Sequence, residues 1–221
     1  ALLGTHSGFY QTYTVSNATK FYFDDIYIGD EILDVAAPVL VSANVISATQ
    51  VDVTFDEALD QTSAELIGNY TITPGITINT ATLDANPALV HLDLTTPLTN
   101  GNSYDLTTIN IADLVPNVSG SQTVNFSYLI SEVPVVGDVV INEFMCDPSP
   151  TVGLNEAEFV EIYNKSNKIF NVQDWKLGDA SSNGTIQQDW LLPGDHMVLA
   201  STSNVDSFAV ATQVTSFPSL N

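Results

Sequence analysis

The carboxylates are the residues of this chain with the widest capacity for chemistry, because Asp and Glu make up 26 of its 221 residues while Lys and Arg together make up four. Asp24 and Asp25 stand among aromatic residues in a strand-like segment, so one carboxylate faces solvent and the other faces inward. An inward carboxylate needs a partner, which can be a cation or the backbone N–H groups at a strand end. Asp24 and Asp25 are therefore a candidate metal site.

Three other carboxylates, Asp56, Glu57 and Asp60, follow a strand-like segment in the middle of the chain. We expect them to form a solvated turn in which Asp60 caps a short helical turn over residues 62–67. The acidic residues do not match the D-x-D-x-D-G spacing of an EF-hand loop. The abundance of carboxylates is therefore the only indication of a metal site in this part of the chain.

Glu143, Glu158 and Glu161 form a third group, and paired carboxylates can in principle hydrolyse a glycosidic bond. No neighbouring pattern supplies an acid with a raised pKa, so we expect structural roles for these residues. Asn142 is expected to hydrogen-bond the backbone of a loop.

The remaining reactive side chains do not combine into a known catalytic motif. His6, His91 and His196 are too scattered to predict a ligand set, and His91 is expected on the solvent face of a strand. Cys146 has no His near it in sequence, and no G-x-S-x-G, H-E-x-x-H or P-loop pattern occurs. The sequence therefore predicts no catalytic residue and no enzyme activity within this segment.

Trp190 is the predicted ligand contact, because a flat aromatic ring can stack on the face of a pyranose sugar. The other tryptophan, Trp175, is expected in a core. A carbohydrate-binding module is therefore one open alternative for the function.

Apolar residues recur at every second position in many short segments along the chain, and long segments with a 3.6-residue period are missing. Turn-forming Pro-Gly, Asn-Gly and Asp-Ala-Asn-Pro clusters separate these segments. Half-buried strands at this spacing predict an all-β fold built of β-sandwiches. The segments are Val51–Phe55, Tyr70–Thr73, Val90–Leu94, Tyr104–Thr107, Val124–Tyr128, Val139–Glu143, Phe159–Tyr163 and His196–Ala200.

Charge and composition exclude several classes of protein. A net charge of −22 repels phosphate backbones and anionic lipid headgroups, so we expect no nucleic-acid partner. No apolar run approaches the roughly 18 residues needed to cross a bilayer, so we expect no membrane insertion. The single cysteine excludes an intrachain disulfide framework. The abundance of Thr, Ser, Asn, Asp and Val favours an extracellular or cell-surface location over a cytosolic one.

Two proline-bearing junctions, near Pro38 and Pro134, divide the chain into residues 1–33, 34–132 and 137–221. The middle piece has the length of one complete sandwich. The first piece holds too few strands to bury a core by itself.

The middle piece resembles the bacterial Ig-like domain of secreted and surface-layer proteins. The resemblance rests on Ala37–Leu40, Val51–Asp60, Asn69–Ile72 and Leu98–Leu106, and it implies a β-sandwich spacer. The closing corner of that family is matched only loosely, by Ile111–Asn117.

The last piece resembles the lamin-tail domain in its bacterial, extracellular form, through Val139–Met145, Glu158–Asn164, Val172–Leu177 and Leu192–Ala200. That family continues with further closing strands, so the resemblance implies an incomplete domain at 137–221. It also implies a core position for Trp175 and structural positions for Glu143 and Glu161.

Residues 1–33 resemble the final two strands of a jelly-roll module of the kind attached to secreted hydrolases and adhesins, through Gly8–Tyr13 and Lys20–Gly29. The resemblance implies that the second Asp of the Asp24-Asp25 pair helps to hold a structural calcium ion. The only cofactor expected is therefore structural calcium, with Asp25 as its main ligand.

Together these observations predict tandem Ig-like β-sandwich domains preceded by the C-terminal strands of an upstream jelly roll. The leading hypothesis is a non-catalytic structural or adhesive segment of a large secreted or cell-surface bacterial protein. Its partners would be other domains of that protein, secretion-system proteins such as those of the type IX route, or glycans. The alternatives are accessory modules of an extracellular hydrolase whose catalytic domain lies elsewhere, and a carbohydrate-binding module.

Overall fold

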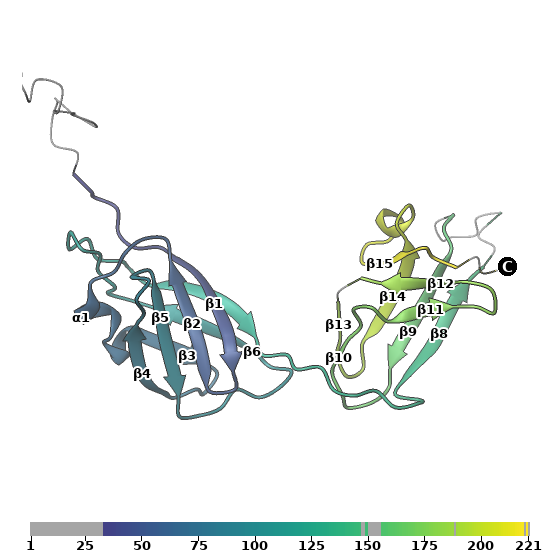
Figure 1. Ribbon diagram of the computed structural model, residues 1–221, viewed down its shortest axis with the longest axis horizontal. Helices are drawn as coiled ribbons and strands as arrows, with labels where there is room; N and C mark the ends of the chain where they lie inside the picture. Colours follow the sequence, from purple (N-terminus) through teal and green to yellow (C-terminus); the bar gives the residue numbers. More distant parts are fainter. Residues whose placement is uncertain (1–32, 147–148, 150–155, 188, 219, 221) are drawn as a thin grey trace, which may run out of the picture. The chain divides into compact units, whose positions relative to one another are not determined.

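The computed structural model describes residues 33–146, 149, 156–187, 189–218 and 220 (Figure 1). The chain divides into two compact units, residues 1–36 and 37–221. The predicted jelly-roll strands and the candidate calcium ligands Asp24 and Asp25 lie outside the described residues.

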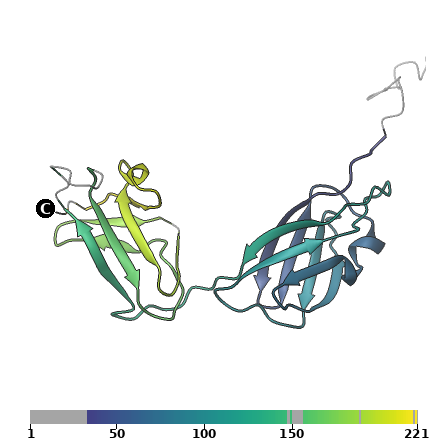
Figure 2. The same cartoon turned by 180° about the vertical axis from the view of Figure 1, so that it is seen from behind.

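Two sheets form the first sandwich. One has four antiparallel strands in the order β1 (Leu40–Ser47), β2 (Gln50–Phe55), β5 (Leu89–Leu94) and β4 (Ile78–Leu83). The other has three, in the order β3 (Tyr70–Thr73), β6 (Ser103–Thr108) and β7 (Gln122–Ser127). Figures 1 and 2 show the two sheets from opposite sides.

The alternation of apolar and polar residues explains how these sheets pack. Val51, Val53 and Phe55 of β2 are buried while the residues between them are only half-buried, and Tyr104 and Leu106 of β6 follow the same rule. The buried faces of both sheets contribute to one continuous apolar core. The predicted alternation in this part of the chain is therefore confirmed.

The helical turn predicted after Asp60 is also confirmed. Helix α1 (Gln61–Ala64) begins after Asp60, whose Oδ1 accepts a hydrogen bond from the Ser63 N–H at 2.9 Å. A 3₁₀ turn, η2 (Ile67–Asn69), follows and leads into β3.

The second sandwich is built on a six-stranded sheet, with strands in the order β11-β12-β15-β14-β9-β8. Strands β14 and β15 run parallel, and the other neighbours run antiparallel. A two-stranded sheet pairs β10 with β13, and the 3₁₀ turn η3 (Val205–Ser207) follows β14. The strand bounds are β8 (Val139–Met145), β9 (Phe159–Asn164), β10 (Phe170–Asn171), β11 (Lys176–Gly178), β12 (Asn183–Ile186), β13 (Trp190–Leu191), β14 (His196–Ser201) and β15 (Thr212–Thr215).

This second sandwich has a core of its own, which includes the fully buried Phe170, Val172, Leu191 and Val214. The ring of Trp175 packs on Phe170 with centroids 5.7 Å apart. Trp175 is half-buried, so it lies at the margin of the core rather than inside it.

Strand β8 departs from the expected half-buried pattern. Ile141 and Phe144 pair in register with Ile162 and Val160, which are buried, yet their own side chains are 61% and 62% exposed. β8 is the last strand of the six-stranded sheet, and the opposing sheet consists of two two-residue strands. The prediction of a buried face on this strand was wrong because alternation says nothing about whether a second layer covers it.

The described part of the chain is thus nearly all β, arranged as Ig-like β-sandwiches, as the sequence predicted. Among the described residues, no helix is both long and apolar enough to span a lipid bilayer.

Candidate functional site

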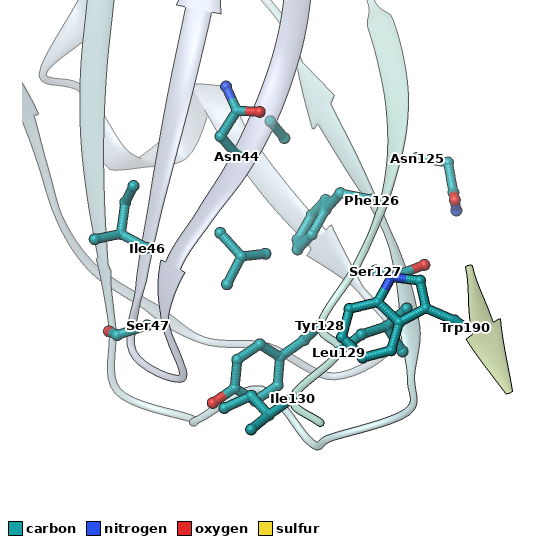
Figure 3. Close-up of a pocket in the computed structure, with 12 residues that line it drawn as sticks. Asn44, Ile46, Ser47, Asn125, Phe126, Ser127, Tyr128, Leu129, Ile130 and Trp190 are labelled. Carbon is teal, nitrogen blue, oxygen red and sulfur yellow. The ribbon is translucent and has the colours of Figure 1, made fainter. Parts of the chain in front are cut away.

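Trp190 lines a groove of about 550 Å³ along one open side of the first sandwich (Figure 3). Its two long sides are β1 and β7, which are the end strands of different sheets. Because each strand has a neighbour on one side only, the two strands face the groove with backbone edges that no sheet partner occupies.

The floor and the walls of the groove come from opposite faces of the same strands. Ala43 and Val45 of β1 and Phe126 of β7 point inward and pack against the core, and they form an apolar floor. The alternate residues Asn44 and Asn125 are exposed and form polar walls. This division follows from the period of two along a strand.

The side chain of Gln122, the first residue of β7, joins β7 to the start of β1. Its Oε1 accepts a hydrogen bond from the Leu40 N–H at 2.8 Å, and its Nε2 donates to the Pro38 carbonyl at 2.7 Å. The carboxamide thus joins the two strands where a third strand would otherwise lie. The open part of the groove runs beside residues 43–47 and 125–130.

Aromatic rings lie at one end of the groove. Figure 3 shows the rings of Tyr128 and Trp190 there, beyond the ring of Phe126. Both Tyr128 and Trp190 are half-buried, so part of each ring remains accessible to a ligand. The predicted ligand contact Trp190 therefore lines the groove with residues that the sequence did not single out.

Trp190 is held by the hydrogen bonds of its own sandwich. It pairs with Asn171 across β10 and β13, and the Asn171 N–H donates to Ser131 Oγ at 3.0 Å. Next to it, Glu132 and Ile169 exchange two hydrogen bonds of 2.8 and 2.9 Å. The segment that follows Ile130 is therefore attached to the strand that positions Trp190.

Asn164 fixes the loops on either side of β13. Its side chain is fully buried and donates to the carbonyls of Lys168, Leu191 and Leu192 at 2.7, 3.1 and 3.0 Å. Its Oδ1 accepts from the N–H and the hydroxyl of Ser166. One amide thus satisfies buried and part-buried backbone groups from two loops, a role that the sequence did not predict for this residue.

None of the twelve residues that line the groove carries a formal charge, although the chain as a whole carries −22. Amides, hydroxyls and aromatic rings share the lining with aliphatic side chains such as Ile46 and Ile130. Such a surface can stack on a flat apolar face and exchange hydrogen bonds, but it has no carboxylate, imidazole, amine or thiol for acid–base catalysis.

A smaller cavity of about 210 Å³ lies in the second sandwich, on the other side of Trp190. Asp189, Asp195 and His196 line it together with apolar residues of β14 and the segment before β15. Asp189 is engaged already, since it accepts a hydrogen bond from Thr212 Oγ1 at 2.5 Å.

The structure brings two of the three predicted glutamates together. Glu143 and Glu161 are register partners across β8 and β9. Glu161 Oε1 accepts hydrogen bonds from His196 Nδ1 at 2.9 Å and from Asn142 Nδ2 at 2.6 Å. Asn142 therefore bonds a side chain rather than a loop backbone, contrary to the sequence prediction.

These contacts set the protonation of Glu161. The hydrogen bond from His196 is the main cause that holds the pKa of this carboxyl below its ordinary value, and the bond from Asn142 adds to it. A glycosidase acid needs a raised pKa, so the environment of Glu161 opposes that role. Tyr163 stacks on the His196 ring with centroids 4.5 Å apart and restrains it further.

His91 has a pair of acidic partners that sequence analysis did not predict. Its Nδ1 lies 2.7 Å from Asp52 Oδ1, and its Nε2 lies 3.1 Å from Asp84 Oδ2. The hydrogen bond to Asp52, followed by that to Asp84, raises the pKa of the imidazole. Since Asp52 and His91 are register partners on β2 and β5, the missing information was the pairing of these strands.

The loosely matched corner at Ile111–Asn117 is organised by Asp113, which is 2% exposed. Burial alone would raise its pKa, but hydrogen bonds from the Asn117 side chain, the Asn117 N–H and the Val115 N–H outweigh burial and lower it. The Asp113 carboxylate therefore fixes the turn at this corner, although the sequence matches the family only loosely here.

Two further predicted groups have structural contacts. Asp56 Oδ1 accepts from the Val39 N–H at 2.7 Å, and Asp60 caps α1 as described above. Cys146 is half-buried and forms no disulfide. Glu158 is half-buried at the start of the segment that leads into β9.

The comparisons with known proteins bear on the second sandwich. Residues 132–219 match the family model of the Lamin Tail Domain. The lamin-tail resemblance seen in the sequence is therefore confirmed for this part of the chain. No curated protein matches the sequence significantly.

Three solved structures of one bacterial S-layer protein, SbsC, are similar over about three quarters of this chain. They are the N-terminal part (16% identity, TM-score 0.42), domains 1–6 (13%, 0.41) and the segment 31–844 (13%, 0.41). The alignments cover 75, 75 and 74% of this chain but only 44, 32 and 32% of those chains. Similarities of this size do not assign a fold or a function.

Proposed function

We propose that this chain is a non-catalytic segment of a larger secreted or cell-surface protein, in which the first sandwich is a spacer and the second mediates protein contact. The observation that carries the proposal is the lamin-tail match at residues 132–219. The carboxylates of Asp60 and Glu161 support it, because both are used in structural hydrogen bonds. The lowered pKa of Glu161 supports the proposal, because the best-placed carboxylate lacks the character of a catalytic acid.

The finer assignments belong to the same proposal. Residues 34–132 form a bacterial Ig-like domain, residues 137–221 a lamin-tail domain, and residues 1–33 strands of a jelly-roll module. The four-on-three sandwich of β1 to β7 supports the first of these. The acidic, weakly basic composition supports a surface location, because a high net charge keeps an exposed chain soluble.

Structural calcium at Asp24 and Asp25 is also proposed, on the alternation of aromatic and acidic residues in that segment. At a calcium concentration about ten times Kd, binding would stabilise the folded state by about 1.4 kcal/mol. Thermal unfolding in CaCl₂ and in EDTA measures this, and an unchanged melting temperature would remove the proposal.

Labelling of intact cells tests the location. An antibody raised against this chain should stain intact cells of the source organism, or the protein should appear in the medium. Staining that requires permeabilised cells, with no protein in the medium, would contradict the proposed function.

The rival function is that of accessory modules in an extracellular hydrolase, and the modular architecture is compatible with it. The full-length reading frame separates the two: a nuclease, protease or glycosidase domain on the same chain would favour the rival. Further Ig-like units without such a domain would favour the spacer.

A further inference from the structure

We propose that the groove between β1 and β7 binds a neutral oligosaccharide, with Tyr128 and Trp190 as stacking surfaces and Asn44, Ser47 and Asn125 as hydrogen-bonding groups. This inference goes beyond the proposed non-catalytic role, because it names a ligand class and a site. The two fail separately: a chain found at the cell surface that binds no sugar would leave the proposed function intact.

The aromatic residues of the groove suit the apolar faces of a pyranose. Tyr128 and Trp190 are half-buried and lie together at one end of the groove (Figure 3), while Phe126, which is 6% exposed, continues the apolar floor. Sugars present flat C–H faces, and aromatic rings at such positions bury those faces without charge.

The walls suit the hydroxyl groups at the sugar edges. Asn44 and Ser47 of β1 are exposed on one side, and Asn125 is exposed on the other. Asn125 directs its Nδ2 to the Tyr104 carbonyl at 3.1 Å and to Asp105 Oδ1 at 2.9 Å, so its amide plane is fixed in orientation. A fixed amide can accept from a ligand hydroxyl without losing further side-chain entropy.

The charge pattern favours a neutral ligand. A lining with no charged side chain offers no cationic partner to a phosphate, sulfate or carboxylate group. The net charge of −22 also repels an anionic glycan at long range. A neutral oligosaccharide meets neither penalty.

The contacts of Gln122 argue against a peptide strand added along the whole of β1. Such a strand would need the Leu40 N–H and the space occupied by the Gln122 carboxamide, which already joins Leu40 to β7. An added strand would therefore be confined to the part of β1 beside Ala43–Ser47.

Titration of the intact chain with cellohexaose, laminarihexaose, maltohexaose and xylohexaose tests the proposal. Both tryptophans of the sequence are in the second sandwich, so Trp175→Phe leaves Trp190 as the sole tryptophan reporter. At least one of these sugars should shift Trp190 fluorescence in this variant and give saturable binding to the wild-type chain by calorimetry.

Variants locate the site. Trp190→Ala should weaken the association constant about tenfold, which is the scale of one lost aromatic contact. Asn44→Ala and Ser47→Ala change exposed side chains outside the core and should weaken binding by smaller factors. Tyr163→Ala removes a half-buried ring outside the groove and should leave sugar affinity unchanged.

Circular dichroism and thermal unfolding of each variant separate a lost contact from a lost fold. The proposal is overturned if none of these sugars binds, or if binding survives Trp190→Ala, Asn44→Ala and Ser47→Ala together. Competition by an extended apolar peptide that binds the groove while all sugars fail would assign the groove to strand addition instead.

Discussion

The two sandwiches differ in how their sheets cover one another. In the first, four strands oppose three, and the buried residues of both sheets meet in one core. In the second, six strands oppose two short ones, and the terminal strand β8 exposes Ile141 and Phe144 although their register partners are buried. A strand's own sequence thus decides which residues share a face, whereas the opposite layer decides whether that face is buried.

Buried polar side chains join separate segments in both sandwiches. In the first, Asn69 donates to the carbonyl of Asn110, which is 41 residues away, whereas Asp113 fixes a turn close to it in the sequence. In the second, Asn164 donates to the Leu192 carbonyl, which is 28 residues away. In each sandwich, therefore, one buried amide holds together segments that are distant in the sequence.

The largest effect is predicted for a substitution in the core of the first sandwich. Leu106→Ala removes a side chain with 0% exposure and should lower the free energy of unfolding of the first sandwich by about 2–5 kcal/mol. Ile141→Thr on β8 should change the free energy of unfolding of the second sandwich by about 0.5 kcal/mol or less. Denaturant unfolding by tryptophan fluorescence follows the second sandwich, and far-UV circular dichroism follows both. Equal losses of unfolding free energy for the two variants would contradict the difference in coverage between the two sandwiches.

The next effect tests the dependence on Asn164. Asn164→Ala leaves one buried and two part-buried carbonyls without its amide donor and should destabilise the second sandwich by about 1–3 kcal/mol. The tryptophan fluorescence transition should move to lower denaturant. Asn167→Ala is the matched control, because Asn167 is exposed in the same loop. A similar shift for both variants would show that Asn164 is not special.

A smaller effect is expected at the helix cap of the first sandwich. Asp60→Ala removes the acceptor of the Ser63 N–H and should cost about 1 kcal/mol, while Asp60→Asn should retain most of the stability. The thermal transition followed by circular dichroism checks both variants. A loss for Asp60→Asn as large as that for Asp60→Ala would point to charge rather than capping.

The smallest effect concerns pH. Because the folded pKa of His91 is raised, its interactions with Asp52 and Asp84 stabilise the fold fully below the unfolded pKa, and this contribution disappears as pH rises through the folded pKa. His91→Gln should therefore cost up to about 0.5 kcal/mol at pH 5.5 and less at pH 8.5, since the group is partly exposed and screened. Unfolding measured at both pH values checks the sign, and a greater cost at pH 8.5 would contradict it.

Much of the fold could be predicted from local pattern. The alternation in Val51–Phe55 and Val90–Leu94 and the cap at Asp60 follow from short-range rules, and all three are confirmed. The exposure of β8 could not be predicted, because it depends on the extent of the opposite sheet. The Asp52–His91 contact required the register of two strands that are far apart in the chain.

The candidate site was predictable only in part. Trp190 could be singled out because a second tryptophan occupied a core motif, but its neighbours in the groove come from strands more than 60 residues earlier in the sequence. The absence of charged residues from the lining is a property of the folded surface. No linear motif joins Asn44, Tyr128 and Trp190.

Hydrogen exchange of the intact chain tests the difference between the two sandwiches most directly. β1 and β8 are both end strands of their sheets, but the second layer of the sandwich covers only β1. Ala43 and Val45 of β1 pack against a core, whereas Ile141 and Phe144 of β8 are exposed. Amides of residues 139–145 should therefore exchange faster than those of residues 40–47. Equal or slower exchange of residues 139–145 would contradict the open edge of the second sandwich.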